Sequence, residues 1–74
     1  MAGGRVIDGR ELQPPEPLEL ALAALDTLPD GEELELLLYC QPRPLYQVLQ
    51  RNGYGWREET LADGTHSIHI WRRA

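Results

Sequence analysis

The chain has 74 residues, one cysteine and a net charge of −5, with twelve Asp and Glu against seven Arg and no Lys. This length permits one small domain with a thin core, because a chain of this size buries only about 60% of its unfolded surface. The acidic balance argues against nucleic acid and anionic membranes as partners, and the lack of lysine excludes Schiff-base chemistry. One cysteine excludes an internal disulfide.

No segment of the sequence predicts membrane insertion or export. No apolar run reaches the roughly 18 residues of a membrane-spanning helix, and residues 1–5 lack the apolar core of a signal peptide. A lone cysteine fits a reducing compartment. We therefore expect a cytoplasmic protein with a flexible N-terminus at residues 1–4 and a single domain at residues 5–74.

The first half of the chain alternates strand and helix signals. Residues 5–8 predict a short strand. Residues 15–28 predict a helix, because their leucines and alanines recur at helical spacing, and the Pro-Asp-Gly sequence that follows ends it. Residues 33–39 predict a central strand, which carries Leu34, Leu36 and Leu38 on one face and Glu35, Leu37 and Tyr39 on the other.

The second half predicts one more helix and a hairpin. Residues 44–52 have the spacing of a short amphipathic helix. Residues 54–61 and 67–72 predict two strands, joined at an Asp-Gly pair that is typical of hairpins. The resulting βαβαββ order predicts an α+β two-layer sandwich, with two helices on one face of a four-stranded mixed sheet. We expect one core formed by Leu18, Leu22, Leu25, Leu34, Leu36, Val48, Leu49, Ile68 and Ile70.

The hairpin has two possible registers. A two-residue turn at residues 63–64 pairs Trp56 with Trp71. A three-residue loop through Thr65 instead places Trp56 on the face of the core isoleucines. We favour the longer loop, because the shorter one sets charged side chains beside those isoleucines.

The junction between the first strand and the first helix carries a motif. Its prolines suit a first helical turn, where φ is preset and the missing N–H has no helical acceptor. The stretch resembles the TusA-like (SirA-like) sulfur carriers, which read Leu-Asp-x-Arg-Gly-Leu-x-Cys-Pro-x-Pro. Five residues fit that pattern, namely Asp8, Arg10, Leu12, Pro15 and Pro17. Glu11 replaces the family's glycine and Pro14 its persulfide-bearing cysteine, so the resemblance implies the fold without that chemistry.

A second motif resembles one branch of this family. Members of the branch read Asp-x-Arg-Glu-Leu-x-Pro-Pro-Glu-Pro at the first helix and x-Pro-Arg-Pro-Leu-Tyr at the second, and residues 8–17 and 42–46 fit both. The branch contains short stand-alone proteins and domains attached to hemerythrin-like domains, and it has no established activity. The resemblance implies a TusA-like domain of unknown function with a relation to sulfur metabolism.

The two proline motifs should meet at one edge of the sheet. Parallel strands place their carboxyl ends on one edge, where both helices begin, and open sheets bind ligands at such edges. Arg10 and Arg43 could hold a small anion or a partner carboxylate there. Alternatively, the prolines only start helices and the arginines pair with Glu11, Glu16 or Glu19. The candidate binding residues are Arg10, Pro14, Pro15, Glu16, Cys40, Arg43 and Pro44.

Cys40 is the one candidate for covalent chemistry. It precedes the N-terminus of the second helix, where the dipole and Arg43 favour a reactive thiol. The alternative is a semi-buried small hydrophobe at a strand end. His66 and His69 should point to opposite faces of a strand. The sequence therefore predicts no metal site, and it indicates no cofactor.

The face of the sheet without helices should carry Leu37, Tyr39 and Trp71. These residues either form a contact patch for a protein partner or are ordinary exposed apolar groups, and we expect a monomer or a weak dimer. The sequence predicts a small accessory or interaction module rather than an enzyme, which binds a protein partner or a small anion at the edge formed by the two helix N-termini. The alternative is a sulfur-relay or thiol-redox protein that uses Cys40.

Overall fold

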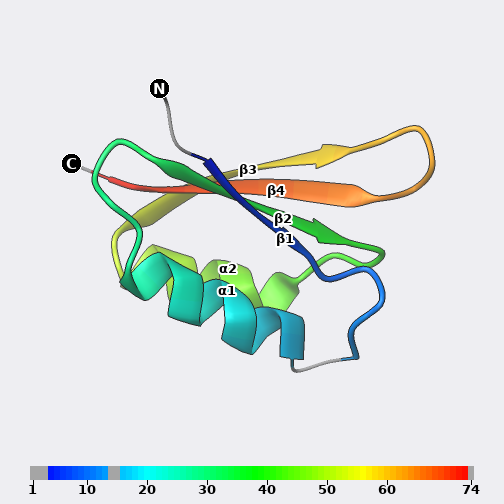
Figure 1. The fold of residues 1–74 in the computed structure, drawn as a ribbon, viewed down its shortest axis with the longest axis horizontal. Helices are drawn as coiled ribbons and strands as arrows, with labels where there is room; N and C mark the ends of the chain where they lie inside the picture. The colour runs from blue at the N-terminus through cyan, green and yellow to red at the C-terminus, as the bar shows by residue number, and fades with distance from the viewer. Residues whose placement is uncertain (1–3, 14–15, 74) are drawn as a thin grey trace.

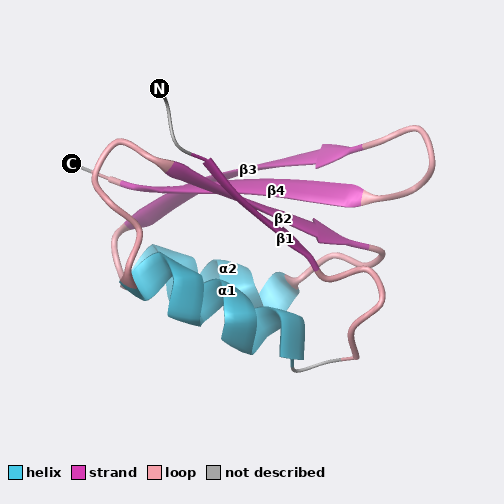
Figure 2. Cartoon of the chain, in the orientation of Figure 1, coloured by secondary structure: helices cyan, strands magenta, loops and turns pink. Residues whose placement is uncertain are grey.

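A computed structural model describes residues 4–13 and 16–73. Two helices lie on one face of a four-stranded sheet, and the other face carries no helix of the described chain (Figure 1, Figure 2). The order of elements and the mixed sheet confirm the predicted α+β sandwich. The elements are β1 (Gly4–Asp8), α1 (Glu16–Asp26), β2 (Glu33–Leu38), α2 (Arg43–Arg51), β3 (Tyr54–Thr60) and β4 (His66–Arg72).

The ends of the elements differ from the predicted ones by one or two residues. Gly4, assigned to a flexible N-terminus, is the first residue of β1, while residues 1–3 lie outside the described chain. The predicted helix start at Pro15 also lies outside it. α1 ends at Asp26 rather than Leu28, because the N–H of Leu28 donates to the carbonyl of Leu25 in a tighter turn. Among residues 4–13 and 16–73, no helix is long and apolar enough to cross a membrane.

The sheet has the strand order β1-β2-β4-β3. β1 runs parallel to β2, whereas β4 lies antiparallel between β2 and β3. The register of β2 and β4 places Leu34 opposite Ile70 and Leu36 opposite Ile68, so four large apolar groups meet beneath the helices. The core consists of Ala21, Leu25, Leu28, Leu34, Leu36, Leu38, Leu45, Leu49, Ile68 and Ile70.

Three residues of the predicted core are only partly buried. Leu18 and Leu22 pack against the core from its rim. Val48 is half-buried, because in the short helix α2 only Leu45 and Leu49, which lie four residues apart on one face, point fully toward the sheet. The strand residues of the predicted core are therefore all buried, and three of its helix residues are not. The prediction also lacks four residues that the structure buries, namely Ala21, Leu28, Leu38 and Leu45.

The hairpin between β3 and β4 places Trp56 on the predicted face of the sheet. Trp56 pairs with Ile70 and lies on the core side. The loop itself is displaced by one residue, because the N–H of Leu61 donates to the carbonyl of Thr65 at 2.8 Å and leaves residues 62–64 as the connection. The N–H of Thr65 also donates to Asp63 Oδ1 at 2.9 Å, which fixes the turn. The prediction that the loop includes Thr65 is wrong.

Candidate functional site

The carboxyl ends of β1 and β2 border an apolar pocket of about 320 Å³. The two strands are parallel, so the loops that follow them lead into the two helices at the same end of the molecule (Figure 1). Open sheets commonly bind ligands at this position. The pocket is lined by the two strand-to-helix loops, the first turns of both helices and the end of β2, through Gly9, Arg10, Leu12, Pro17, Leu18, Leu36, Leu38, Tyr39, Cys40, Gln41, Pro42, Pro44 and Leu45.

Gly9 brings the first loop close against the end of β2. Its N–H donates to the carbonyl of Leu37 at 2.8 Å, which extends the contact between the two parallel strands. A Cβ at this position would lie 2.8 Å from Leu38 Cδ2 and 3.1 Å from Pro17 Cβ. The pocket wall is therefore built on a residue without a side chain.

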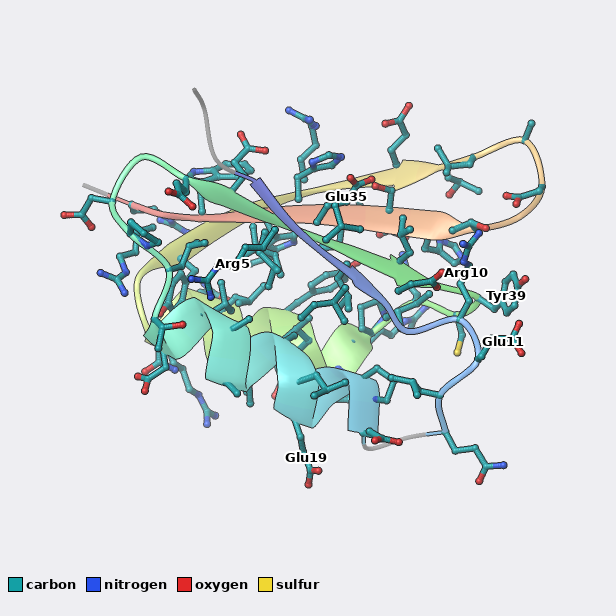
Figure 3. The ribbon with its side chains drawn as sticks, in the orientation of Figure 1. Arg5, Arg10, Glu11, Glu19, Glu35 and Tyr39 are labelled. Carbon is teal, nitrogen blue, oxygen red and sulfur yellow. The ribbon has the colours of Figure 1, made fainter. Side chains whose placement is uncertain are left out.

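Arg10 binds Asp8 rather than the acidic residues considered from the sequence. Its Nε donates to Oδ1 at 2.8 Å and its Nη2 to Oδ2 at 2.7 Å, a bidentate pair. These hydrogen bonds lower the pKa of Asp8 to about 2. Figure 3 shows Arg10, Glu11 and Tyr39 together at the pocket end of the molecule. The charge of Arg10 is thus already compensated, which weakens the anion-binding interpretation.

The other predicted binding residues fall into three groups. Cys40 and Pro44 line the pocket together with Arg10. Arg43 and Glu16 are exposed at the first positions of α2 and α1, and the Nε of Arg43 donates to Gln41 Oε1 at 3.4 Å. Pro14 and Pro15 lie outside the described residues. The structure therefore brings Arg10, Cys40 and Pro44 into one site.

Cys40 is exposed, so the interpretation as a semi-buried hydrophobe is wrong. It follows β2 by two residues and lies in the loop that leads into α2. Residues 39–42 of this loop line the pocket, and because Cys40 is exposed its thiol lies at the pocket rim rather than in the core. A group attached to Cys40 would have the apolar pocket within reach.

Glu58 is the centre of a polar network that the sequence did not predict. Its carboxylate accepts from Gln41 Nε2 at 2.8 Å and from the Tyr46 hydroxyl at 2.9 Å, and it lies 2.9 Å from His66 Nδ1. The hydrogen bond from Gln41, followed by those from Tyr46 and His66, holds the pKa of Glu58 below its usual value. The network therefore ties the pocket loop to α2 and to the hairpin.

The ring of Tyr46 also stacks on Trp56, with centroids 5.4 Å apart and an interplanar angle of 5°. Burial, and then the neighbouring Glu58, raises the pKa of Tyr46. A three-residue connection places Trp56 and Glu58 on the helix side, whereas a two-residue turn would have placed both on the opposite face.

The two histidines lie on opposite faces of β4, as predicted. His66 contacts Glu58 on the helix side. His69 lies on the face of the sheet that carries no helix, here called the open face, where its Nδ1 is 3.4 Å from Glu33 Oε1. Its Nε2 is 3.2 Å from the hydroxyl of Ser67, which donates to Glu35 at 2.7 Å. Ser67 is 1% exposed, so this Ser-His-Glu arrangement offers no accessible nucleophile.

The open face does not gather its predicted apolar residues into one patch. Trp71 lies opposite the start of β2 and packs against Gly55, where a Cβ would be 2.6 Å from its indole nitrogen. Tyr39 follows the other end of β2 and lines the pocket. Leu37 is half-buried, and the polar side chains of Glu35 and His69 lie between the two ends of β2.

Comparison with known proteins supports an assignment to a family. None of the curated proteins matches the sequence. The family model described as "Uncharacterized conserved protein (DUF2249)" matches residues 6–72, which span every described helix and strand in whole or in part. The chain therefore belongs to the DUF2249 family.

Proposed function

We propose that this domain is a non-catalytic interaction module whose pocket receives an apolar side chain of a partner protein. The observation that carries the proposal is the apolar pocket at the carboxyl ends of β1 and β2. Its volume lies near the lower limit for small-molecule sites, which are typically about 300–1,000 Å³. Such a pocket suits one anchor side chain, and interfaces draw much of their binding energy from a few anchors of this kind.

Two features favour an apolar group over a small anion. Arg10, the cation that lines the pocket, already forms a bidentate pair with Asp8. The first turn of α1 carries Glu16 and Glu19, whose charges oppose an anion at that helix N-terminus.

The scaffold supports a distant relation to the TusA-like sulfur carriers. The βαβαββ order and the motif from Asp8 to Pro17 are what that relation implies. Pro14 stands at the position of the persulfide-bearing cysteine, and proline has no group that can carry sulfur. In this proposal the module keeps the scaffold and has exchanged sulfur transfer for partner binding.

A peptide-display selection tests the module directly. Random peptides selected on the wild-type domain should contain an apolar anchor, and they should lose binding to Leu12→Glu, which places a charge in the pocket wall. Leu20→Glu is the matched control, because Leu20 is exposed on α1. Peptides that bind both variants equally, or a selection that enriches no apolar anchor, would contradict the proposal.

The exposure of Cys40 supports a second candidate function, a sulfur relay. In that reaction the Cys40 thiolate attacks the terminal sulfur of a donor persulfide, the donor S–S bond breaks, and the donor cysteine leaves as a thiolate. Incubation with a cysteine desulfurase and its substrate, followed by intact mass spectrometry, tests it. A stable gain of one sulfur atom in the wild type, absent from Cys40→Ser, would favour the relay over the module.

A further inference from the structure

Alternate residues of β3 direct their backbone N–H and C=O groups away from the sheet. β3 is an edge strand whose partner in the described sheet is β4 (Figure 2). Hydrogen-bonded pairs alternate along an antiparallel ladder. At one end the N–H of Arg73 donates to Gly53, and at the other the N–H of Leu61 donates to Thr65. The odd-numbered residues of β3 therefore bond to β4, and the even-numbered ones point away from the sheet.

The outward-facing backbone groups form a symmetric set. They belong to Tyr54, Trp56, Glu58 and Thr60. The carbonyl of Tyr54 already accepts from Arg73 Nε at 3.2 Å. The remaining three residues are spaced evenly around Glu58, so the edge is complementary to a copy of itself.

We propose that two copies of this chain pair through their β3 strands, antiparallel, around a two-fold axis at Glu58. In this register Trp56 of each copy lies opposite Thr60 of the other, and the two Glu58 residues lie opposite each other. Each of these pairs exchanges two backbone hydrogen bonds. The two four-stranded sheets then become one continuous sheet, with all helices on the same side.

Charge selects this register over its neighbours. Arg57 and Glu59 are exposed on the open face of β3. The axis at Glu58 places Arg57 of each copy opposite Glu59 of the other, and opposite charges in directly facing positions stabilise a strand pair. A shift of the axis by one residue would set Arg57 against Arg57 or Glu59 against Glu59. Such facing like charges are destabilising.

The helix side of the edge is compatible with the same pairing. The Glu58 carboxylate is already bound within its own chain by Gln41, Tyr46 and His66, so the two facing carboxylates are each held by partners of their own. Trp56 is only half-buried although it stacks on Tyr46. A second strand along this edge would cover the outer side of that ring.

Reciprocal charge reversal tests the proposal. Sedimentation velocity over a dilution series should show a reversible dimer of the full wild-type chain. Arg57→Glu and Glu59→Arg each replace two attractive pairs with two repulsive ones, and each should weaken dimerisation about tenfold or more. The double variant Arg57→Glu/Glu59→Arg recreates both attractive pairs and should dimerise like the wild type. Glu19→Arg, on the exposed side of α1, is the control with the same charge change and should also dimerise like the wild type (Figure 3).

Thermal melting of each variant separates loss of pairing from loss of folding. Both single variants should remain folded, because their side chains are exposed. A wild type that stays monomeric at its solubility limit would overturn the proposal. A dimer that survives both single variants would also overturn it and would point to the open face instead. Failure of the double variant to restore the dimer, with all variants folded, would refute the Arg57–Glu59 register.

Discussion

Gly9→Ala tests the close approach on which the pocket is built. An added Cβ would lie 2.8 Å from Leu38 Cδ2, 3.1 Å from Pro17 Cβ and 3.3 Å from the Leu37 carbonyl oxygen. The leucine methyl can rotate away, whereas the proline ring and the β2 backbone must shift as units. Overpacking of this kind costs about 1–3 kcal/mol. In a domain of this size each kcal/mol lowers the melting temperature by about 4–8 °C.

Thermal melting, monitored by far-ultraviolet circular dichroism, measures the change in melting temperature. The sign of this change distinguishes a crowded position from an uncrowded one. Gly9 does not have a positive φ, so an uncrowded alanine there would stabilise the fold by about 0.4–1 kcal/mol through the unfolded chain. Gly64 is the contrasting position, because its φ is +90° and no atom lies within 4 Å of its built Cβ. Asparagine tolerates that backbone, so Gly64→Asn should cost less than Gly64→Ala, while Gly9→Asn should cost more than Gly9→Ala. A Gly9→Ala variant that melts at or above the wild-type temperature would refute the steric argument.

Further predictions concern the core, the network and pH. Leu36→Ala should cost about 2–5 kcal/mol in urea unfolding, because Leu36 is fully buried, and an equal cost for the half-buried Leu22→Ala would contradict the core assignment. Glu58→Gln should cost about 1–2 kcal/mol, because it removes the charge that strengthens three contacts, and an unchanged urea midpoint would show that the network contributes nothing. The pKa values of Asp8 and Glu58 are lowered in the folded state, so the stability they contribute is present above the unfolded pKa of about 4 and is lost as the pH falls toward 2. The urea midpoint of Asp8→Asn should therefore fall less steeply than that of the wild type over this range, and parallel curves would count against the Asp8–Arg10 pair.

The fold could be predicted because its signals are periodic and local. The leucine stripe of α1 and the alternation of β2 each have one period that fits, so the elements follow directly from the spacing. The hairpin was harder, because an Asp-Gly pair accommodates loops of different lengths. The buried isoleucines of β4 decided the face of Trp56, but nothing local decided which residues form the loop.

The site could be placed but not described from the sequence. Parallel strands require that both helix N-termini share an edge, and this located the pocket. Its apolar character depends on the directions of the side chains in residues 9–12 and 39–42. These residues form irregular loops, whose sequences lack the hydrophobic periodicity that indicates side-chain direction in helices and strands. The Asp8–Arg10 pair was missed for the same reason, because it forms in the turn after β1, where both the backbone N–H and the guanidinium of Arg10 donate to Asp8. The arginines suggested an anion, whereas the residues that line the pocket are mostly apolar.

Disulfide tethering at Cys40 tests the apolar pocket most directly. Cys40 is the single thiol of the chain and lies at the pocket rim, so thiol-containing fragments can be captured there under mild reductant and weighed by intact mass spectrometry. Fragments with aliphatic or aromatic groups should be retained over polar fragments on the same linker. Leu12→Glu should remove this preference, while Leu20→Glu should retain it. Equal capture of apolar and polar fragments by the wild type, or an apolar preference that survives Leu12→Glu, would contradict a pocket that binds apolar groups.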